Sequence, residues 1–413
     1  GYEGRQAKAS EALRQAGIPG IKYLDQGSRG AGSGTRNYVV FDDKLIDIIR
    51  KYGLNHIQMA EELTRSIGVD RIEVSGQGWT VANNDCVIEA RRQPENHVDL
   101  IVTSIPFANH YEYSPSYNDF GHTENNDHFW KQMDYLTPEL LRVLQPGRLY
   151  CCHVKDRILF GNVTGAGAPT VSPFHAEAIM HGRKHGFDYM GMITVVTDVV
   201  RENNQTYRLG WSEQCKDGTK MGVGMPEYLL LFRKPPTSTE KSYADNPVVK
   251  SKQDYTRGRW QIDAHGFARS NGNRFLTPEE LATMPHERMF KTYRKFSMEN
   301  IYDFEHHVRL NDGLAEVGQL PVTFMLLQPQ SWHPDVYTDI TRMLTLNTSQ
   351  SARNKEMHLC PMQFDIADRV INQCSMEGET VFDPFGGLMT VPVRAVMQKR
   401  RAIACELNPG YFA

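Results

Sequence analysis

The sequence predicts an α/β protein built on a doubly wound, mixed and mainly parallel sheet. Strand-like apolar runs alternate with helix-like segments through residues 51–234. The alternation stops after Lys234-Pro235-Pro236 for about 120 residues and resumes at His358. Alternating strands and helices form parallel sheets because each helix crosses back over the sheet before the next strand. We therefore expect one sheet domain made of residues 51–234 and 356–413, with an insertion at 235–355.

The individual elements follow from apolar periodicity and from turn residues. Residues 57–67 have helical spacing, and a strand ends near Asp85. The rest of the first segment is predicted as the strand Val98–Thr103, the helix Phe129–Leu144, the strand Arg148–Val154, the helix Ala176–His185 and the strands Tyr189–Val196 and Glu227–Phe232. The second segment is predicted as a helix that ends at Ile371, the strand Thr380–Phe382, the helix Pro392–Gln398 and the strand Arg401–Glu406.

Residues 1–50 form an N-terminal extension to which the sequence assigns no role. Gly30, Gly32 and Gly34 could cradle a phosphate, but a flexible turn is the favoured interpretation. A strand is expected at Tyr38–Phe41 and a helix at Asp43–Tyr52. Because residue 1 is not Met, the chain is expected to be a processed product or part of a longer polypeptide with further domains.

Composition limits the class of protein. The chain has 413 residues, of which 40% are hydrophobic and 23% charged, as in ordinary globular proteins. It has neither the roughly 18 apolar residues that span a bilayer nor a signal peptide, so we expect a cytoplasmic protein without membrane contacts. The net charge of -3 means that any nucleic-acid contact must come from a local patch.

The seven cysteines are scattered, as expected for reduced thiols in a cytosol. They show no spacing of a zinc site. The one local cluster, Cys151-Cys152-His153, lies in an apolar run, where a buried strand is favoured over a metal site. No metal is therefore expected.

The first segment that indicates chemistry is Val381-Phe382-Asp383-Pro384-Phe385-Gly386-Gly387, an apolar strand followed by an acid and two glycines. In open α/β sheets, ligands bind at the carboxyl ends of strands, and glycines let the backbone approach them. Glu406 ends the next apolar strand, 23 residues after Asp383. An acid there is placed to accept the ribose hydroxyls of a nucleoside cofactor. Taken alone, the turn is equally compatible with a structural role.

The second such segment is the strand Val98–Thr103 followed by Ser104-Ile105-Pro106-Phe107. It delivers a small polar side chain, a rigid turn and an aromatic ring to the same edge of the sheet. A base flipped out of DNA needs acceptors for its exocyclic amine and an aromatic face for stacking. By itself, such a turn more often has only the structural role of ending a strand.

Together the two segments resemble the β-group DNA amino-methyltransferases, the N4/N6 DNA methylase family, from about Val81 to Tyr411, and phage enzymes in particular. The family's catalytic motif is Asp, Asn or Ser followed by Pro-Pro and an aromatic residue. Ser104-Ile105-Pro106-Phe107 matches three of its four positions, with Ile105 in place of the first proline. The cofactor motif is similar to Asp383–Thr390, where Met389 replaces the second glycine.

The resemblance implies a methyltransferase fold in circularly permuted order, with S-adenosyl-L-methionine as cofactor. It implies that Ser104, Ile105, Pro106 and Phe107 are catalytic. Upstream, Asn84-Asp85 resembles the acid near the cofactor's adenine, and His358–Gln363 resembles the loop over its methionine moiety. The implied cofactor-binding residues are Asp85, Cys360, Pro361, Asp383, Phe385, Gly387 and Glu406.

The implied substrate is double-stranded DNA with a flipped base, and Ser104 favours N4 of cytosine slightly over N6 of adenine. The insertion is expected to recognise the target, because it places aromatic residues among cations. The alternative interpretation is that these cations form a solvated basic face without a binding role. The expected phosphate contacts are Arg257, Arg259, Lys291 and Arg294.

Other functions are disfavoured by specific absences in the sequence. A C5-cytosine methyltransferase needs a nucleophilic cysteine, usually after proline, and no cysteine here follows one. A P-loop ATPase would need GxxxxGK[ST], which is missing. The alternative from another class is a catalytically inactive, methyltransferase-fold module that only binds DNA. This alternative is considered because Ile105 and Met389 differ from the residues that the family motifs have at these positions.

Overall fold

The computed structural model describes most of the sheet domain and part of the insertion. The helices predicted at 43–52 and 57–67 lie outside the described residues. The described residues are 20–24, 36–40, 70–108, 111–114, 116, 118–159, 161–165, 167, 169–197, 215, 226–240, 243–247, 249–264, 278–285, 288, 304–320, 335–353, 355 and 357–413.

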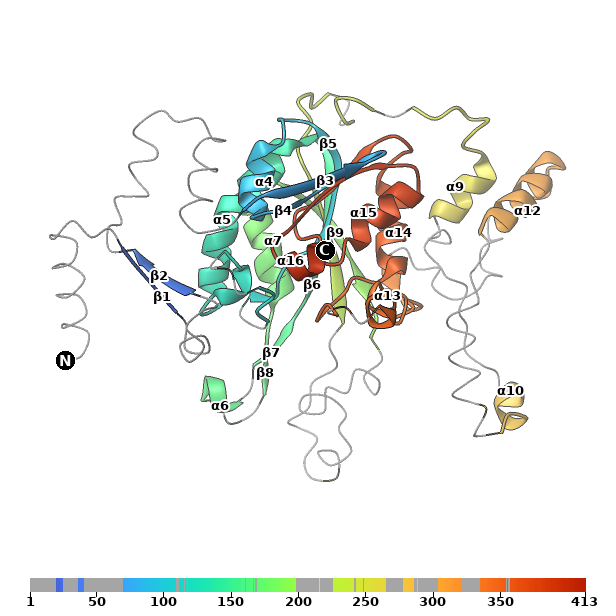
Figure 1. Cartoon of the computed structure of the whole chain (residues 1–413). Coiled ribbons are helices and arrows are strands. Elements are labelled where there is room, and N and C mark those ends of the chain that lie inside the picture. The colour runs from blue at the N-terminus through green and yellow to red at the C-terminus, as the bar shows by residue number, and fades with distance from the viewer. Residues whose placement is uncertain are drawn as a thin grey trace.

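A mixed sheet of nine strands forms the centre of the described chain (Figure 1). Five neighbouring strands in its middle run parallel. β10 pairs antiparallel with both β6 and β9, and β3 pairs antiparallel with β4. The predicted α/β class with a mixed, mainly parallel sheet is therefore confirmed. In spatial order the strands are β11 (Val336–Tyr337), β9 (Asp188–Val195), β10 (Glu227–Arg233), β6 (Leu144–Lys155), β5 (Val98–Ser104), β12 (Thr380–Asp383), β13 (Arg401–Glu406), β4 (Trp79–Asn83) and β3 (Ile72–Gly76).

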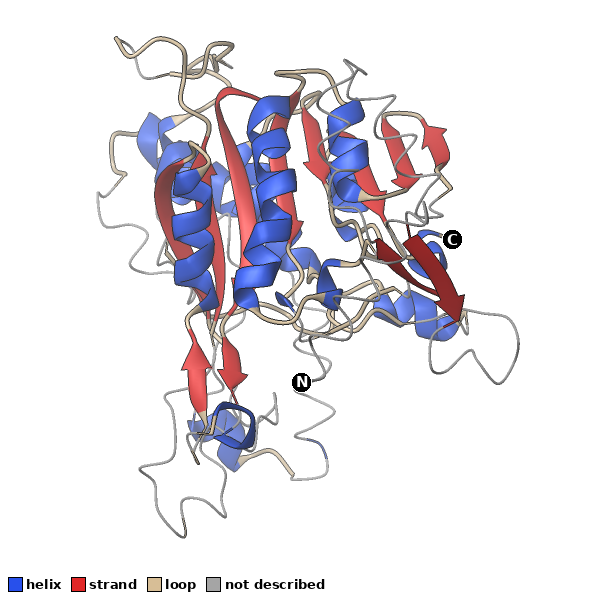
Figure 2. Cartoon of the chain, turned by 90° about the vertical axis from the view of Figure 1, so that its left-hand side faces the viewer, coloured by secondary structure: helices blue, strands red, loops and turns tan. Residues whose placement is uncertain are grey.

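Helices cover both faces of this sheet, so it is doubly wound. Three helices pack on one face, which is turned toward the viewer in Figure 2: α4 (Cys86–Arg92), α5 (Asn126–Val143) and α7 (Phe174–Lys184). The other face carries α14 (Phe364–Cys374) and α15 (Thr390–Met397).

Two buried clusters result, because side chains alternate across a strand. On β5, Ile101 belongs to the first cluster, whereas Leu100 and Val102 belong to the second.

The helices form where apolar residues recur at helical spacing and a polar residue caps the first turn. In α14, Ile366, Ala367, Val370 and Ile371 are buried and face the sheet. Each such aliphatic side chain larger than alanine contributes about 1.5–3 kcal/mol by leaving water. At the start of α5, the Asn125 side chain accepts a hydrogen bond from the backbone N–H of His128 at 2.9 Å, which satisfies an otherwise unpaired donor.

Most predicted elements of the sheet domain are found within a few residues of their predicted bounds, and β13 matches the predicted strand Arg401–Glu406. The strand pattern did not reveal β3, or a hairpin of β7 (Arg157–Leu159) and β8 (Thr170–Ser172). This hairpin projects beyond the main sheet and carries α6 (Gly161–Thr164) at its tip (Figure 1). The predicted strand at Tyr38–Phe41 corresponds to β2 (Arg36–Val40), which pairs antiparallel with β1 (Gly20–Leu24).

The segment predicted as an insertion contains α9 (Arg257–Ala264), α10 (Pro278–Ala282), α12 (Phe304–Glu316) and α13 (Asn347–Ala352). α9 packs closely on α12, since the Asn311 side chain donates to the Gly258 carbonyl at 3.3 Å. The end of the segment lies against the sheet domain instead, because β11 pairs in parallel with β9.

None of the helices in the described ranges is long and apolar enough to cross a membrane.

Candidate functional site

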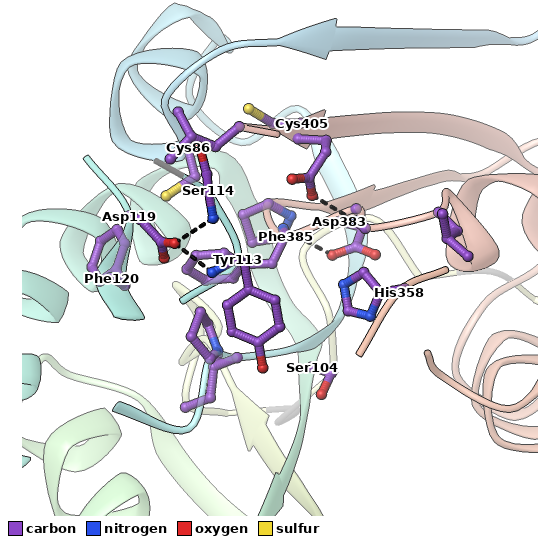
Figure 3. Close-up of a pocket in the computed structure, with 18 of the residues that line it drawn as sticks. Cys86, Ser104, Tyr113, Ser114, Asp119, Phe120, His358, Asp383, Phe385 and Cys405 are labelled. Carbon is purple, nitrogen blue, oxygen red and sulfur yellow. Dashed lines mark hydrogen bonds between the residues drawn. The ribbon is translucent and has the colours of Figure 1, made fainter. Parts of the chain in front are cut away.

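The carboxyl ends of four adjacent parallel strands meet at one edge of the sheet. β5 ends at Ser104, β12 at Asp383 and β13 at Glu406, and Asn84-Asp85 follows β4. These residues line a single pocket. Figure 3 shows Asp383 and His358 on one side of it, Asp119 and Phe120 on the other, and the ring of Tyr113 between them. This is the edge at which open α/β sheets bind ligands.

All of the residues predicted from the sequence as catalytic or cofactor-binding line this pocket, although they are separated by up to 321 positions in the chain, from 85 to 406. The structure therefore brings the two predicted groups together. They are Asp85, Ser104, Ile105, Pro106, Phe107, Cys360, Pro361, Asp383, Phe385, Gly387 and Glu406.

Asp383 is held at the bottom of the turn after β12. Its Oδ1 accepts from the Thr103 hydroxyl at 2.6 Å and from the Phe385 N–H at 3.0 Å. Thr103 lies on the neighbouring strand β5, so this bond ties the Asp383 turn to the Ser104 turn. Burial raises the pKa of Asp383 to about 7, even though both bonds favour the charged form.

The glycine turn is closely packed. Gly387 has φ of 52°, and a Cβ at this position would lie 3.1 Å from His358 Nε2, so glycine is favoured on both grounds. Met389, where the family motif has glycine, also adopts a left-handed φ of 66°. This conformation costs a non-glycine residue about 1–2 kcal/mol.

The sequence left open whether Met389 obstructs the cofactor site. A Cβ built on Gly386 would lie 2.9 Å from Met389 Sδ, so this side chain folds back against Gly386. Met389 is not among the residues that line the pocket within the described chain. The Met389 side chain therefore occupies space behind the turn.

Glu406 is buried at the end of β13, and each of its carboxylate oxygens accepts one backbone N–H. The donors are Gly387 and Asn408, both at 2.7 Å. Burial raises the pKa of Glu406 to about 7. The remaining lone pairs can accept from hydroxyl groups of a ligand.

Asp85 has a structural role as well as a place in the pocket. Its Oδ1 caps α4 by accepting from the Ile88 N–H at 2.9 Å, and its Oδ2 accepts from the Asn118 side chain at 2.9 Å. Burial raises the pKa of Asp85 above its ordinary value. Each oxygen of Asp85 thus already accepts one hydrogen bond within the protein, as each oxygen of Glu406 does.

Two loops line the pocket and meet in a ring contact. Asp119 organises the first loop by accepting from the N–H groups of Tyr113, Ser114 and Gly121 at 2.6–2.8 Å. The Tyr113 ring then stacks on His358 of the second loop, with centroids 5.5 Å apart (Figure 3). Burial lowers the pKa of His358 to about 4, so a neutral imidazole faces Tyr113. Sequence reasoning missed Tyr113 and Asp119, because neither follows a strand.

The turn after β5 is fixed from both sides. Ile105 is only 2% exposed and packs in the first buried cluster, so an apolar side chain replaces the proline of the motif. The Phe107 carbonyl accepts from Arg157 Nη1 at 3.0 Å, and the Phe107 ring packs in the same cluster while lining the pocket. The loss of one proline is thus offset by packing and by the arginine from β7.

Ser104 also belongs to a hydrogen-bonded network that the sequence did not predict. Its hydroxyl lies 3.1 Å from His153 Nδ1, and His153 Nε2 lies 3.1 Å from Glu227 Oε2. Arg342 Nη1 donates to the same Glu227 oxygen at 2.8 Å, and its Nη2 donates to the other. The prediction that Cys151-Cys152-His153 forms a buried strand is confirmed, but the imidazole has a specific polar partner at each nitrogen.

Within the described residues, one group could hold a metal ion outside the pocket. Asp134, His181 and His185 place their ligand atoms within 4.8 Å of one another, where α5 meets the end of α7. Lys184 Nζ lies 2.7 Å from Asp134 Oδ1, so this carboxylate already has a cationic partner. The expectation that no metal is needed stays a prediction.

The residues predicted to bind DNA are only partly described. Arg257 and Arg259 lie on α9, and Arg257 is exposed. Lys291 and Arg294 lie outside the described residues. Neither described arginine lines the pocket, so the structure does not join them to the predicted catalytic residues.

Comparison with known proteins gives several matches. A family model for N6/N4 methyltransferases, described as DNA methylase, matches residues 98–413. The Type II methyltransferase M.MthZI of Methanothermobacter thermautotrophicus is 26% identical over 166 residues, which cover 37% of this chain and 39% of that relative's length.

Two solved structures also match the chain over much of its length. TTHA0409 of Thermus thermophilus, a putative DNA modification methylase solved as a complex with S-adenosyl-L-methionine, is 20% identical with a TM-score of 0.42, over 79% of this chain and 87% of that one. The cytosine-N4-specific PvuII DNA methyltransferase is 12% identical with a TM-score of 0.40, over 81% of this chain and 83% of that one. Because the family model covers well over half of the chain, including both pocket motifs, this protein belongs to the N6/N4 DNA methylase family.

Proposed function

We propose that this protein transfers a methyl group from S-adenosylmethionine to an exocyclic amino group of a base in DNA. The observation that carries the proposal is one pocket in which Ser104-Ile105-Pro106-Phe107 faces the turn of Asp383 and the buried carboxylate of Glu406. Family membership supports DNA as the substrate. The chain orders its catalytic motif before its cofactor motif, which we take as the circularly permuted arrangement.

The donor groups in the pocket fit S-adenosylmethionine. Glu406 has free lone pairs on both oxygens for the ribose hydroxyls, and Gly387 lets the backbone come close. By the family resemblance, Asp85 would lie beside the adenine, and Cys360 and Pro361 would lie over the methionine moiety. Asp383 and Phe385 line the same pocket.

Bound S-adenosylmethionine supplies an electrophilic methyl group on a sulfonium. The chain's own task is to make the amine nucleophilic, because its lone pair is delocalised into the ring of the base. The Ser104 hydroxyl and the Ile105 carbonyl accept hydrogen bonds from the amine and favour a pyramidal nitrogen. Phe107 stacks on the flipped base and fixes its orientation. Acceleration then comes mainly from positioning, without a covalent enzyme intermediate.

We favour N4 of cytosine over N6 of adenine, because serine at the first motif position resembles the cytosine-N4 enzymes. A neutral hydroxyl can accept from either amine, so the choice of base depends on contacts to the edge of its ring.

The experiment that tests the function is to incubate the protein with labelled S-adenosylmethionine and unmodified double-stranded DNA, digest to nucleosides and separate them by mass. We expect N4-methylcytosine. N6-methyladenine would reverse the choice of base and keep the mechanism, whereas 5-methylcytosine would refute the mechanism. If no labelled nucleoside forms while the protein still binds DNA, the inactive DNA-binding module is the better description.

We further propose that residues 235–355 recognise the DNA target. Replacing Arg257, Arg259, Lys291 and Arg294 together by alanine should weaken DNA binding. The slope of log K against log salt concentration should become shallower by up to about 3.6, since each phosphate contact contributes about 0.9. Titrations over a range of salt concentrations measure this. Lys399→Ala, which removes an exposed cation paired with Glu377, is the control. Unchanged affinity at low salt would identify the four cations as a solvated face.

A further inference from the structure

Three neighbouring strands carry a continuous polar path at the edge of the sheet that holds the pocket. Ser104 ends β5, His153 lies directly beside it on β6, and Glu227 begins β10. His153 and Glu227 side chains are each 8% exposed, and of these three residues Ser104 is the one that lines the pocket. Buried polar groups are costly unless every one is paired, so this arrangement requires an explanation.

The charge of Glu227, at the end of the path away from the pocket, determines how the other groups are protonated. Glu227 accepts two bonds from Arg342, and Lys155 Nζ lies 3.5 Å from its Oε1. Although burial opposes ionisation, these partners hold the pKa of Glu227 well below its ordinary value. Glu227 is therefore an anion and can only accept hydrogen bonds.

An anionic Glu227 determines the tautomer of His153. Nε2, at 3.1 Å from Glu227 Oε2, must carry the imidazole proton that the carboxylate accepts. In the neutral ring Nδ1 then has a free lone pair, and its neighbour at 3.1 Å is the Ser104 hydroxyl. The Ser104 O–H consequently donates to His153, and both lone pairs of its oxygen are left for a ligand in the pocket.

We propose that His153, held by Glu227 and Arg342, positions the Ser104 hydroxyl as an acceptor and takes up the proton released by the methylated amine. This proposal rests on the proposed function. It explains how a neutral serine can serve at a motif position where aspartate occurs in relatives. A carboxylate accepts without help, whereas a hydroxyl must first direct its own proton elsewhere.

The amine nitrogen forms a bond to the methyl carbon while the carbon–sulfur bond breaks, so the positive charge passes from sulfur to nitrogen. The methylated nitrogen then gives one N–H proton to Ser104 Oγ, and the Ser104 proton moves to His153 Nδ1. The imidazolium that forms is stabilised by the Glu227 anion and later returns its proton to water through Ser104. The path thus offers both an acceptor and a proton sink.

A double-mutant cycle tests the coupling of His153 to Ser104. His153→Ala should lower kcat by about 10²-fold, the usual size of a general acid–base contribution, and leave binding of S-adenosylhomocysteine unchanged. In a Ser104→Asp background, the same change should have little effect, because the carboxylate needs no proton acceptor. His181→Ala removes a buried imidazole bonded to Thr137 and serves as control. Equal losses from His153→Ala in both backgrounds would overturn the proposal.

A second measurement does not depend on turnover. The His153 signals in ¹⁵N-histidine spectra of the full chain can be assigned by their loss in His153→Ala. We expect them to show the Nε2–H tautomer. In Ser104→Ala, the Nδ1 resonance should shift, because its hydrogen-bond donor is lost. An Nδ1–H tautomer would refute the proposal even in an active enzyme. A protein that methylates no DNA would refute the proposed function, while the tautomer would still be readable.

Discussion

Replacing Ser104 by alanine should lower kcat for methyl transfer by about 10²-fold or more, while the affinity for S-adenosylmethionine stays nearly constant. The reason is that the Ser104 hydroxyl meets the flipped base only in the reactive complex, so its loss removes transition-state stabilisation and little ground-state binding. Single-turnover rates and calorimetric cofactor titrations on the same preparation separate the two quantities.

A matched control is Ser375→Ala, which removes another buried hydroxyl, one that donates to the Ile371 carbonyl far from the pocket motifs. It should change stability and leave kcat alone. Phe107→Ala should also reduce turnover, through loss of stacking worth about 1–3 kcal/mol, although part of its effect will come from the buried cluster in which the ring packs. Full activity of Ser104→Ala would show that the catalytic assignment is wrong.

The sheet and the edge that carries the pocket could be predicted because they depend on local signals. β13 and the strand around Cys151 are continuous apolar runs, and Ser104, Asp383 and Glu406 each follow such a run. Polar residues at the carboxyl ends of adjacent parallel strands must lie close together. The grouping of the pocket residues therefore followed from strand order and from the family motifs.

The residues that the sequence did not reveal act through distant contacts. His153 stands in an apolar run, and only its pairing with β5 and β10 shows that both ring nitrogens have polar partners. Arg342 reaches Glu227 across 115 positions and lies in the segment predicted as an insertion. Tyr113 and Asp119 lie in a loop whose shape depends on backbone donors. Periodicity carries no information about such contacts.

Met389 illustrates the limit of comparing motifs letter by letter. A methionine where relatives have glycine predicts a conflict with the cofactor, yet the side chain lies against Gly386. The backbone keeps the left-handed conformation that glycine would adopt, at a cost in stability. Whether a departure from a motif affects the site depends on the direction of its side chain.

Replacing Glu406 by alanine should weaken S-adenosylmethionine binding at least tenfold. The change removes hydrogen bonds from the ribose hydroxyls to a charged acceptor, worth about 1.5 kcal/mol or more. It also leaves the N–H groups of Gly387 and Asn408 without their carboxylate, which loosens the glycine turn. Glu377→Ala, at an exposed acid paired with Lys399, should have no effect on binding.

The same residue gives cofactor binding a defined dependence on pH. In the free protein, burial raises the pKa of Glu406 to about 7, so a large fraction is protonated at pH 6. Ribose hydroxyls that donate to the carboxylate favour its charged form, so binding lowers this pKa and releases protons. Affinity should therefore rise as pH increases toward 7 and level off above it.

Calorimetry at pH 6 in buffers with different ionisation enthalpies measures the number of protons released on cofactor binding. In Glu406→Ala, this number should fall by the protons that Glu406 releases in the wild type. The pocket also contains Asp383, whose pKa burial raises to about 7, and Asp85 and Asp119, whose pKa values burial raises, and any share of these carboxyls should remain in the variant. A wild-type enthalpy independent of buffer would mean that none of these carboxyls changes protonation on binding. In that case the cofactor would not contact Glu406 as proposed, however much the alanine variant weakened binding, because the weakening would then come from the loosened turn.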